Sequence, residues 1–136
     1  MPSKTSMKRA KRDLREGERP STAAGEFVRE EMEHVREGKH GARSPKQAIA
    51  VGLSKARRAG VPLTPPRKGR TSERTRRSAE AAYEVGQGRR APRSRSAKRG
   101  RAVSAALKRE RRSSASRREL SAQAKRAAAA RRRRRR

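Results

Sequence analysis

The sequence predicts an all-α protein in which a small helical hairpin, at about residues 22–37 and 45–59, precedes a long basic segment that is largely disordered or only conditionally helical. Two observations lead to this prediction. Most of the bulky apolar residues lie between residues 27 and 63, and most of the charge lies after them. Of the net charge of +29, residues 1–20 carry +4, residues 21–64 carry +3 and residues 65–136 carry +22. Only 29% of the 136 residues are hydrophobic, too few to offset chain entropy in one large core, so a large globular enzyme is excluded.

The N-terminal segment reads as a mobile basic arm. Residues 1–20 intersperse Lys and Arg with polar residues and end at Arg19-Pro20. We expect this arm to be disordered, with at most transient helix over residues 8–15.

The first helix of the hairpin is expected after Pro20. Ser21 or Thr22 is the expected N-cap, and Gly38 is placed to take the left-handed position after the last turn. At 100° per residue, the apolar side chains fall within an arc of about 140°, the stripe of a helix that packs on one side. These side chains are Ala24, Phe27, Val28, Met32 and Val35.

The second helix has the clearest local signature. In Ser44-Pro45-Lys46-Gln47, a serine N-cap precedes a proline at the first helical position, and the glutamine is placed to complete a capping box. The helix should end near Ala59, with Gly60 as its left-handed terminator and residues 38–43 as the connection between antiparallel helices. A hairpin of about 40 residues is too small for a self-sufficient core, so we expect a second copy or DNA to stabilise it.

The segment after the hairpin begins with a stiff connector, Val61-Pro62-Leu63-Thr64-Pro65-Pro66, which is expected to end the folded unit. Beyond it, residues 73–85 and 97–130 are rich in helix formers, and residues 89–95 form a break rich in Ser and Arg. We expect these helices to form mainly when phosphates neutralise their side chains.

The basic pairs of the C-terminal segment are typical of phosphate binding. Guanidinium forks bind phosphate oxygens in a bidentate manner, and each neutralised phosphate releases condensed counterions. The segment contains one aromatic residue, Tyr83, so it lacks the platforms on which unpaired bases stack. Duplex DNA is therefore favoured over single-stranded RNA, and structured RNA remains an alternative. The expected contacts are Arg76, Arg77, Arg89, Arg90, Lys98, Arg99, Arg111, Arg112, Arg117, Arg118, Lys125, Arg126, Arg131, Arg132, Arg133, Arg134, Arg135 and Arg136.

The hairpin offers a second group of candidate contacts. Several polar and basic residues of its second helix share an arc of about 120°, as in a helix-turn-helix, although no third helix is expected to hold this helix in a groove. An ordinary solvated face is the alternative. With the preceding loop, the candidates are Lys39, His40, Arg43, Lys46, Gln47, Ser54, Arg57 and Arg58.

Four glutamates of the first helix, Glu26, Glu30, Glu33 and Glu37, lie within about 60° of one another. Like charges at this spacing are unfavourable unless a cation covers them. The face is therefore either solvated or covered by a basic segment of this chain or of a second copy, and it should face away from phosphate.

The sequence offers no site for catalysis, a cofactor or a small-molecule substrate. It has no Cys, and His34 and His40 have no third ligand at a fixed spacing, so we expect no metal site. It has neither an apolar run long enough to span a membrane nor a signal peptide, which predicts a cytoplasmic location.

The middle of the chain resembles a known family. The stretch GEFVREEMEHVREGKHG (25–41), followed by ARSPKQAIAVGLSKARRAGV (42–61), is similar to an uncharacterised family of short basic bacterial proteins, often labelled DNA-binding or plasmid stabilisation proteins. The likeness is most specific from Glu37 to Gly60, and it implies a bacterial, nucleoid-associated setting. The C-terminal segment is similar in composition to the basic tails of linker-histone-like proteins.

These observations together predict a non-enzymatic protein that binds duplex DNA by neutralising phosphates, with little sequence specificity and a nucleoid-associated or plasmid-maintenance role. The alternative is a protein-interaction module that its basic segment tethers to RNA or the ribosome.

Overall fold

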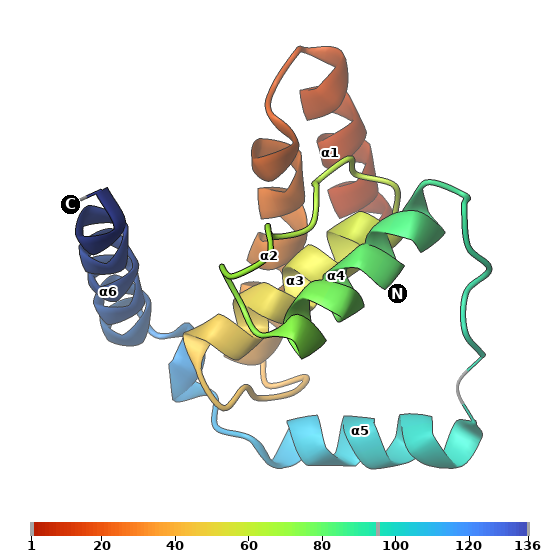
Figure 1. Ribbon diagram of the computed structural model, residues 1–136. Coiled ribbons are helices and arrows are strands. Elements are labelled where there is room, and N and C mark those ends of the chain that lie inside the picture. The colour runs from red at the N-terminus through yellow and green to blue at the C-terminus, as the bar shows by residue number, and fades with distance from the viewer. Residues whose placement is uncertain (1, 95, 136) are drawn as a thin grey trace. The chain divides into compact units, whose positions relative to one another are not determined.

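The computed structural model describes residues 2–94 and 96–135, and these residues form six α-helices and one short 3-10 helix (Figure 1). The elements are α1 (Lys4–Arg15), α2 (Pro20–Arg36), α3 (Pro45–Arg58), α4 (Glu73–Gly86), α5 (Ala97–Arg109), η1 (Ser113–Ala115) and α6 (Arg117–Arg135). Helix accounts for 69% of the described residues. The predicted long disordered tail is therefore wrong, because α4, α5 and α6 occupy it. Each of these helices begins after a serine whose side chain accepts a backbone N–H of the first turn, namely Ser72, Ser96 and Ser116.

The chain divides into two compact units whose boundaries fall inside α2 and α3. Residues 1–31 and 50–94 form one, called here the α1–α4 unit. Residues 32–49 and 95–136 form the other, called the α5–α6 unit.

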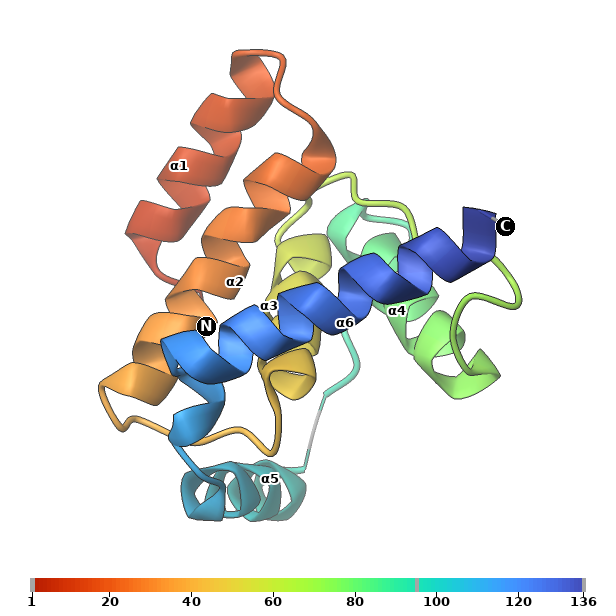
Figure 2. The same ribbon diagram turned by 90° about the vertical axis from the view of Figure 1, so that its left-hand side faces the viewer.

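The N-terminal arm is helical, which corrects the prediction that residues 1–20 are disordered. Helix α1 runs antiparallel to α2 in both Figure 1 and Figure 2. Its apolar residues Met7, Ala10 and Leu14 recur at helical spacing and pack on the core, where Ala10 is only 2% exposed. Burial of this short stripe against α2 is what stabilises a segment that composition alone marks as disordered.

Helix α2 begins earlier than predicted. It starts at Pro20, and the backbone N–H of Thr22 donates to the carbonyl of Arg19 at 2.9 Å, so neither Ser21 nor Thr22 is the N-cap. Proline suits the first helical position, because it lacks the N–H that would be unpaired there. The C-terminal end agrees with the prediction, since Gly38 has a φ of +77° and Lys39 N donates to His34 O at 3.0 Å.

Helix α3 is capped by Ser44, as the sequence predicts: the Gln47 N–H donates to Ser44 Oγ at 3.2 Å. The other half of the capping box is shifted by one residue, because Gln47 Oε1 accepts the N–H of Arg43, at 2.6 Å, and not that of Ser44. The helix ends at Arg58, and Gly60 follows with a φ of +99°.

The core of the α1–α4 unit gathers around Phe27, which is 1% exposed. Residues from α1, α2, α3 and the connector surround it: Ala10, Ala23, Ala24, Ala56 and Val61, with Met7, Leu14, Leu53, Ala59 and Leu63 at the edge. The hairpin, which we expected a second copy or DNA to stabilise, is thus packed within the chain against α1 and the connector. The small size of the hairpin is therefore no longer a reason to expect a dimer.

Helix α4 packs closely in the same unit. Ala79 and Ala82 are buried, and Gly86 comes so near α3 that a Cβ on it would lie 1.7 Å from the carbonyl oxygen of Arg57. Gln87 Nε2 also donates to the carbonyl of Gly60 at 3.4 Å. Glycine at position 86 is what permits this approach.

We expect opposite effects of alanine at the two internal glycines of α2 and α3. A Cβ at Gly52 would lie 2.6 Å from the Cα of Val28, whereas a Cβ at Gly25 meets no atom within 4 Å. Gly52→Ala should therefore lower the free energy of unfolding by about 1–3 kcal/mol. Gly25→Ala should raise it by up to about 1 kcal/mol, because alanine is the better helix former. Urea titrations of the two variants measure both changes, and a stable Gly52→Ala variant would contradict the close packing of α2 on α3.

In the α5–α6 unit, the loop after α2 is held by the last turn of α5 and by the segment that follows it. Gly41 N donates to Leu107 O at 2.8 Å, and Ala42 N donates to Arg111 O at 2.9 Å. A Cβ on Gly41 would lie 1.8 Å from the carbonyl oxygen of Glu110, so only glycine fits there. The buried hydroxyl of Ser114 donates to the carbonyl of Ala42.

These contacts explain why the continuous helix predicted over residues 97–130 is interrupted. Glu110 has extended backbone angles (φ −72°, ψ 156°), and a single 3-10 turn, η1, follows before α6 begins. Serine side chains bond locally to the backbone and so favour such turns over helix interior. The interruption also leaves the Arg111 carbonyl available to bond the loop.

Candidate nucleic-acid interface

The α5–α6 unit carries most of the excess charge. Its segments contain 22 basic and 4 acidic residues, which gives a net charge of +18. The α1–α4 unit contains 20 basic and 9 acidic residues, and its net charge is +11. Helix α6 is the extreme case, because nine of its 19 residues are Arg or Lys, one is Glu, and none of those described is buried. A helix without an apolar face is not a core element, so its side chains are available to a ligand.

Eleven of the predicted tail contacts are exposed and make no ion pair or hydrogen bond through their side chains with the residues that the structure describes. They lie on α5 and α6 and are Lys98, Arg99, Arg117, Arg118, Lys125, Arg126, Arg131, Arg132, Arg133, Arg134 and Arg135. The sequence prediction omitted Arg101, Lys108 and Arg109 of α5, which are equally exposed. Arg101 was missed because the prediction followed adjacent basic pairs, whereas Lys108 and Arg109 form such a pair that the prediction omitted. Arg136 and the break residue Arg95 lie outside the described residues.

Other predicted tail contacts have carboxylate partners. Arg76 makes a bidentate contact with Glu73, at 3.2 and 2.9 Å, and this hydrogen bond lowers the pKa of Glu73. Arg90 lies 3.6 Å from Glu84, and Arg77 lies 4.0 Å from Glu73. In the α5–α6 unit, Arg111 is paired with Glu119 at 3.7 Å. These partners compete with phosphate, so the four arginines are weaker candidates than the eleven residues above.

The aromatic ring of the C-terminal segment is also occupied. The guanidinium of Arg89 lies over the ring of Tyr83, 6.0 Å from its centre. This cation–π contact uses the face on which an unpaired base would stack.

Arg57 has a structural role in the α1–α4 unit. It is 8% exposed, and its guanidinium donates to the carbonyls of Leu63 and Thr64 at 3.1 and 3.3 Å. Burial lowers its pKa below the ordinary value. Arg57 therefore holds the middle of the connector and is left out of the proposed interface. The two other predicted contacts on this part of α3 are less buried than Arg57: Arg58 is exposed and Ser54 is half-buried.

The remaining hairpin candidates lie in the α5–α6 unit. Arg43 and Lys46 are exposed, Gln47 is committed to the cap of α3, and Lys39 pairs with Glu37 at 3.3 Å. His40 Nδ1 lies 2.9 Å from the carbonyl oxygen of Gly41. The ring of His40 also meets that of His34 edge to face at 6.0 Å.

The acidic face of α2 is partly covered by α1. Arg9 of α1 lies 3.9 Å from Glu26, and the backbone N–H of Ser3, next to α1, donates to Glu30 at 2.8 Å. Glu33 and Glu37 are exposed. Of the two predicted alternatives, docking of a basic segment of this chain therefore holds for the first two glutamates, and α1 does not cover Glu37, which pairs with Lys39 at 3.3 Å.

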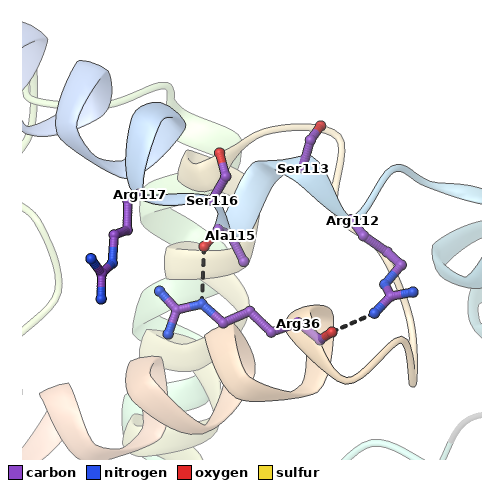
Figure 3. Close-up of a pocket in the computed structure, with 6 residues that line it drawn as sticks. All are labelled: Arg36, Arg112, Ser113, Ala115, Ser116 and Arg117. Atoms are coloured by element: carbon purple, nitrogen blue, oxygen red, sulfur yellow. Dashed lines mark hydrogen bonds between the residues drawn. The ribbon is translucent and has the colours of Figure 1, made fainter.

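A cavity of about 520 Å³ opens beside η1 in the α5–α6 unit (Figure 3). Its lining consists of Arg36, Arg112, Ser113, Ala115, Ser116 and Arg117. Arg36 is absent from the sequence prediction. Its position in the last turn of α2 was the available signal, but the sequence does not show that residues 112–117 fold back to meet it.

Comparisons with protein-family models, curated proteins and solved structures found no match. The resemblance of residues 25–61 to short bacterial DNA-binding proteins therefore remains a prediction. No helix in the described part of the chain has both the length and the apolar character needed to cross a bilayer.

Proposed function

We propose that the protein is a non-enzymatic nucleic-acid-binding protein that holds duplex DNA by neutralising phosphates, in a nucleoid-associated or plasmid-maintenance role. The observation that carries this proposal is α6, a 19-residue helix with nine basic side chains and no buried residue among those described. At 1.5 Å per residue it is about 28 Å long, a length over which duplex DNA presents about 16 phosphate charges.

The arrangement of the charge favours phosphate contacts over base reading. Five successive arginines, Arg131 to Arg135, point in all directions around the end of α6, since successive residues are rotated by 100°. Such an end neutralises phosphates at any rotation about the helix axis. Reading of base edges requires a few side chains in a fixed orientation on one helix face, and α6 has no apolar face that would fix one.

We therefore expect the full chain to bind unrelated duplex sequences equally well. Fluorescence anisotropy with two labelled duplexes of about 20 base pairs and unrelated sequence should give Kd values within about threefold of each other, because phosphate contacts carry no sequence information. A single strand of the same length should bind more weakly, since its charge density is lower. A strong preference for one duplex would contradict the proposal, and tighter binding to a structured RNA of equal length would assign the target to RNA.

A further inference from the structure

The cavity beside η1 concentrates positive charge without carboxylates. Three of its six lining residues are arginines, two are serines, and the lining contains no Asp or Glu (Figure 3). Two nearby carboxylates of the same unit are engaged elsewhere: Glu119 with Arg111 at 3.7 Å, and Glu37 with Lys39 at 3.3 Å. The lining therefore carries a formal charge of about +3, and an anion is the ligand that this charge attracts.

Two of the three guanidinium groups are held in place by neutral partners. Arg36 Nε donates to the carbonyl oxygen of Ala115 at 3.1 Å, and Arg112 Nη2 donates to the carbonyl oxygen of Arg36. A carbonyl fixes the position of a guanidinium without cancelling its charge. The two nitrogens of Arg36 beyond Nε thus remain as donors on a side chain that is already ordered, which reduces the entropy lost when a ligand binds.

The third arginine of the cavity adds further donors. Arg117 makes no ion pair or hydrogen bond through its side chain with the residues that the structure describes. The hydroxyls of Ser113 and Ser116 point away from the three guanidinium groups in Figure 3, and Ser116 Oγ accepts the N–H of Glu119 at 3.2 Å. The arginines are therefore the side chains that would donate to a bound anion.

We propose that this cavity is a binding site for a phosphate monoester group. Such a group carries a charge of about −1.5 to −2 at pH 7 and three terminal oxygens, each a strong acceptor. An internal phosphodiester of a nucleic acid has a single negative charge and two such oxygens. The guanidinium groups of Arg36 and Arg117 lie on the same side of η1 in Figure 3 and, with the positive charge of Arg112 in the same lining, match the former better. A volume of about 520 Å³ leaves room for part of the molecule that bears the phosphate.

The site is separate from the duplex-binding function proposed above. Long-range attraction to a duplex comes from many side chains along α5 and α6, so the loss of one of them changes it little. Binding of a phosphate group between Arg36 and Arg117 depends strongly on each of these two side chains. The two proposals can therefore fail independently, and one substitution distinguishes them.

Arg117→Gln is the test variant, and Arg118→Gln is its matched control. Both residues are exposed in the first turn of α6, both substitutions remove one charge, and only Arg117 lines the cavity. The probes are a tetranucleotide with a 5′-phosphate, the same tetranucleotide with a 5′-hydroxyl, and inorganic phosphate. Calorimetric titration of the full chain near physiological salt measures the affinities.

We expect the phosphorylated tetranucleotide to bind at least about tenfold more tightly than the hydroxyl form, and Arg117→Gln to remove most of this difference while Arg118→Gln preserves it. Competition by inorganic phosphate at equal concentration would support the site and identify free phosphate as its ligand. Equal loss in the two variants would show general charge attraction and overturn the proposal. So would equal binding of the two tetranucleotides by the natural chain. Arg36→Gln, with its helix content checked by circular dichroism, should repeat the effect of Arg117→Gln.

Discussion

Replacing Arg131–Arg135 with glutamine should make the affinity for duplex DNA about half as dependent on salt as that of the natural chain. If the natural chain neutralises about ten phosphates, log K falls with log salt at a slope of about −9, a loss of about five decades between 50 and 200 mM salt. The five substituted arginines are exposed and have no partner among the described residues, so each is available to a phosphate. Their removal should reduce the slope to about −4.5. Anisotropy titrations at several salt concentrations measure both slopes.

The matched control removes five charges from α1. Lys4, Lys8, Lys11, Arg12 and Arg15 are exposed, but they lie in the α1–α4 unit, which has the smaller charge excess. Glutamine at these positions gives the same net charge as the α6 variant and should change the slope much less. If the slope of log K against log salt becomes shallower by the same amount in both variants, binding depends on net charge alone and α6 has no special part in it. A slope shallower than about −3 for the natural chain would remove the proposed function altogether.

Lys55→Met should destabilise the α1–α4 unit by about 3 kcal/mol. Glu31 is the most deeply buried carboxylate described, with an exposure of 0%, and the ammonium of Lys55, one quarter exposed, donates to it from α3. Methionine keeps most of the apolar stem of lysine and removes the charge. A buried carboxylate that loses its cationic partner costs several kcal/mol, and other contacts of Glu31 set the figure at the lower end of that range. Denaturant titration measures the change in the free energy of unfolding.

The same substitution at Lys46 is the control. Lys46 lies on α3, is exposed and has no side-chain partner among the described residues, so Lys46→Met should change the free energy of unfolding by less than about 0.5 kcal/mol. Equal effects at the two positions would show that the Lys55 contact with Glu31 contributes no stability beyond that of an exposed lysine.

The basic helices illustrate why composition misjudged the C-terminal segment. Repulsion among its charges led us to expect disorder, yet Ala and Arg are strong helix formers, and serine N-caps at positions 72, 96 and 116 begin three helices there. Both signals are local and were present in the sequence. We gave the mean charge more weight than the serine N-caps, but the N-caps predict the observed helices better.

The sequence by itself determined the features that depend on neighbours within one or two helical turns. Gly38 and Gly60 end their helices in the left-handed conformation, Ser44 caps α3, and the apolar stripe around Phe27 faces the core. Backbone hydrogen bonds in a helix join residues three or four apart, so the residues that begin and end it are adjacent in the chain. The excess of basic residues is likewise readable without coordinates.

Only the tertiary structure decided which charges are available. It buries Arg57 against the connector, places α1 beside the glutamates of α2, and joins Arg36 to Arg112 across 76 residues of sequence to line one cavity. An arginine in the sequence carries the same charge whether it lies over a carbonyl, beside a carboxylate or in solvent. Its ability to bind a phosphate depends on those surroundings, and they are set by segments that are distant in the chain.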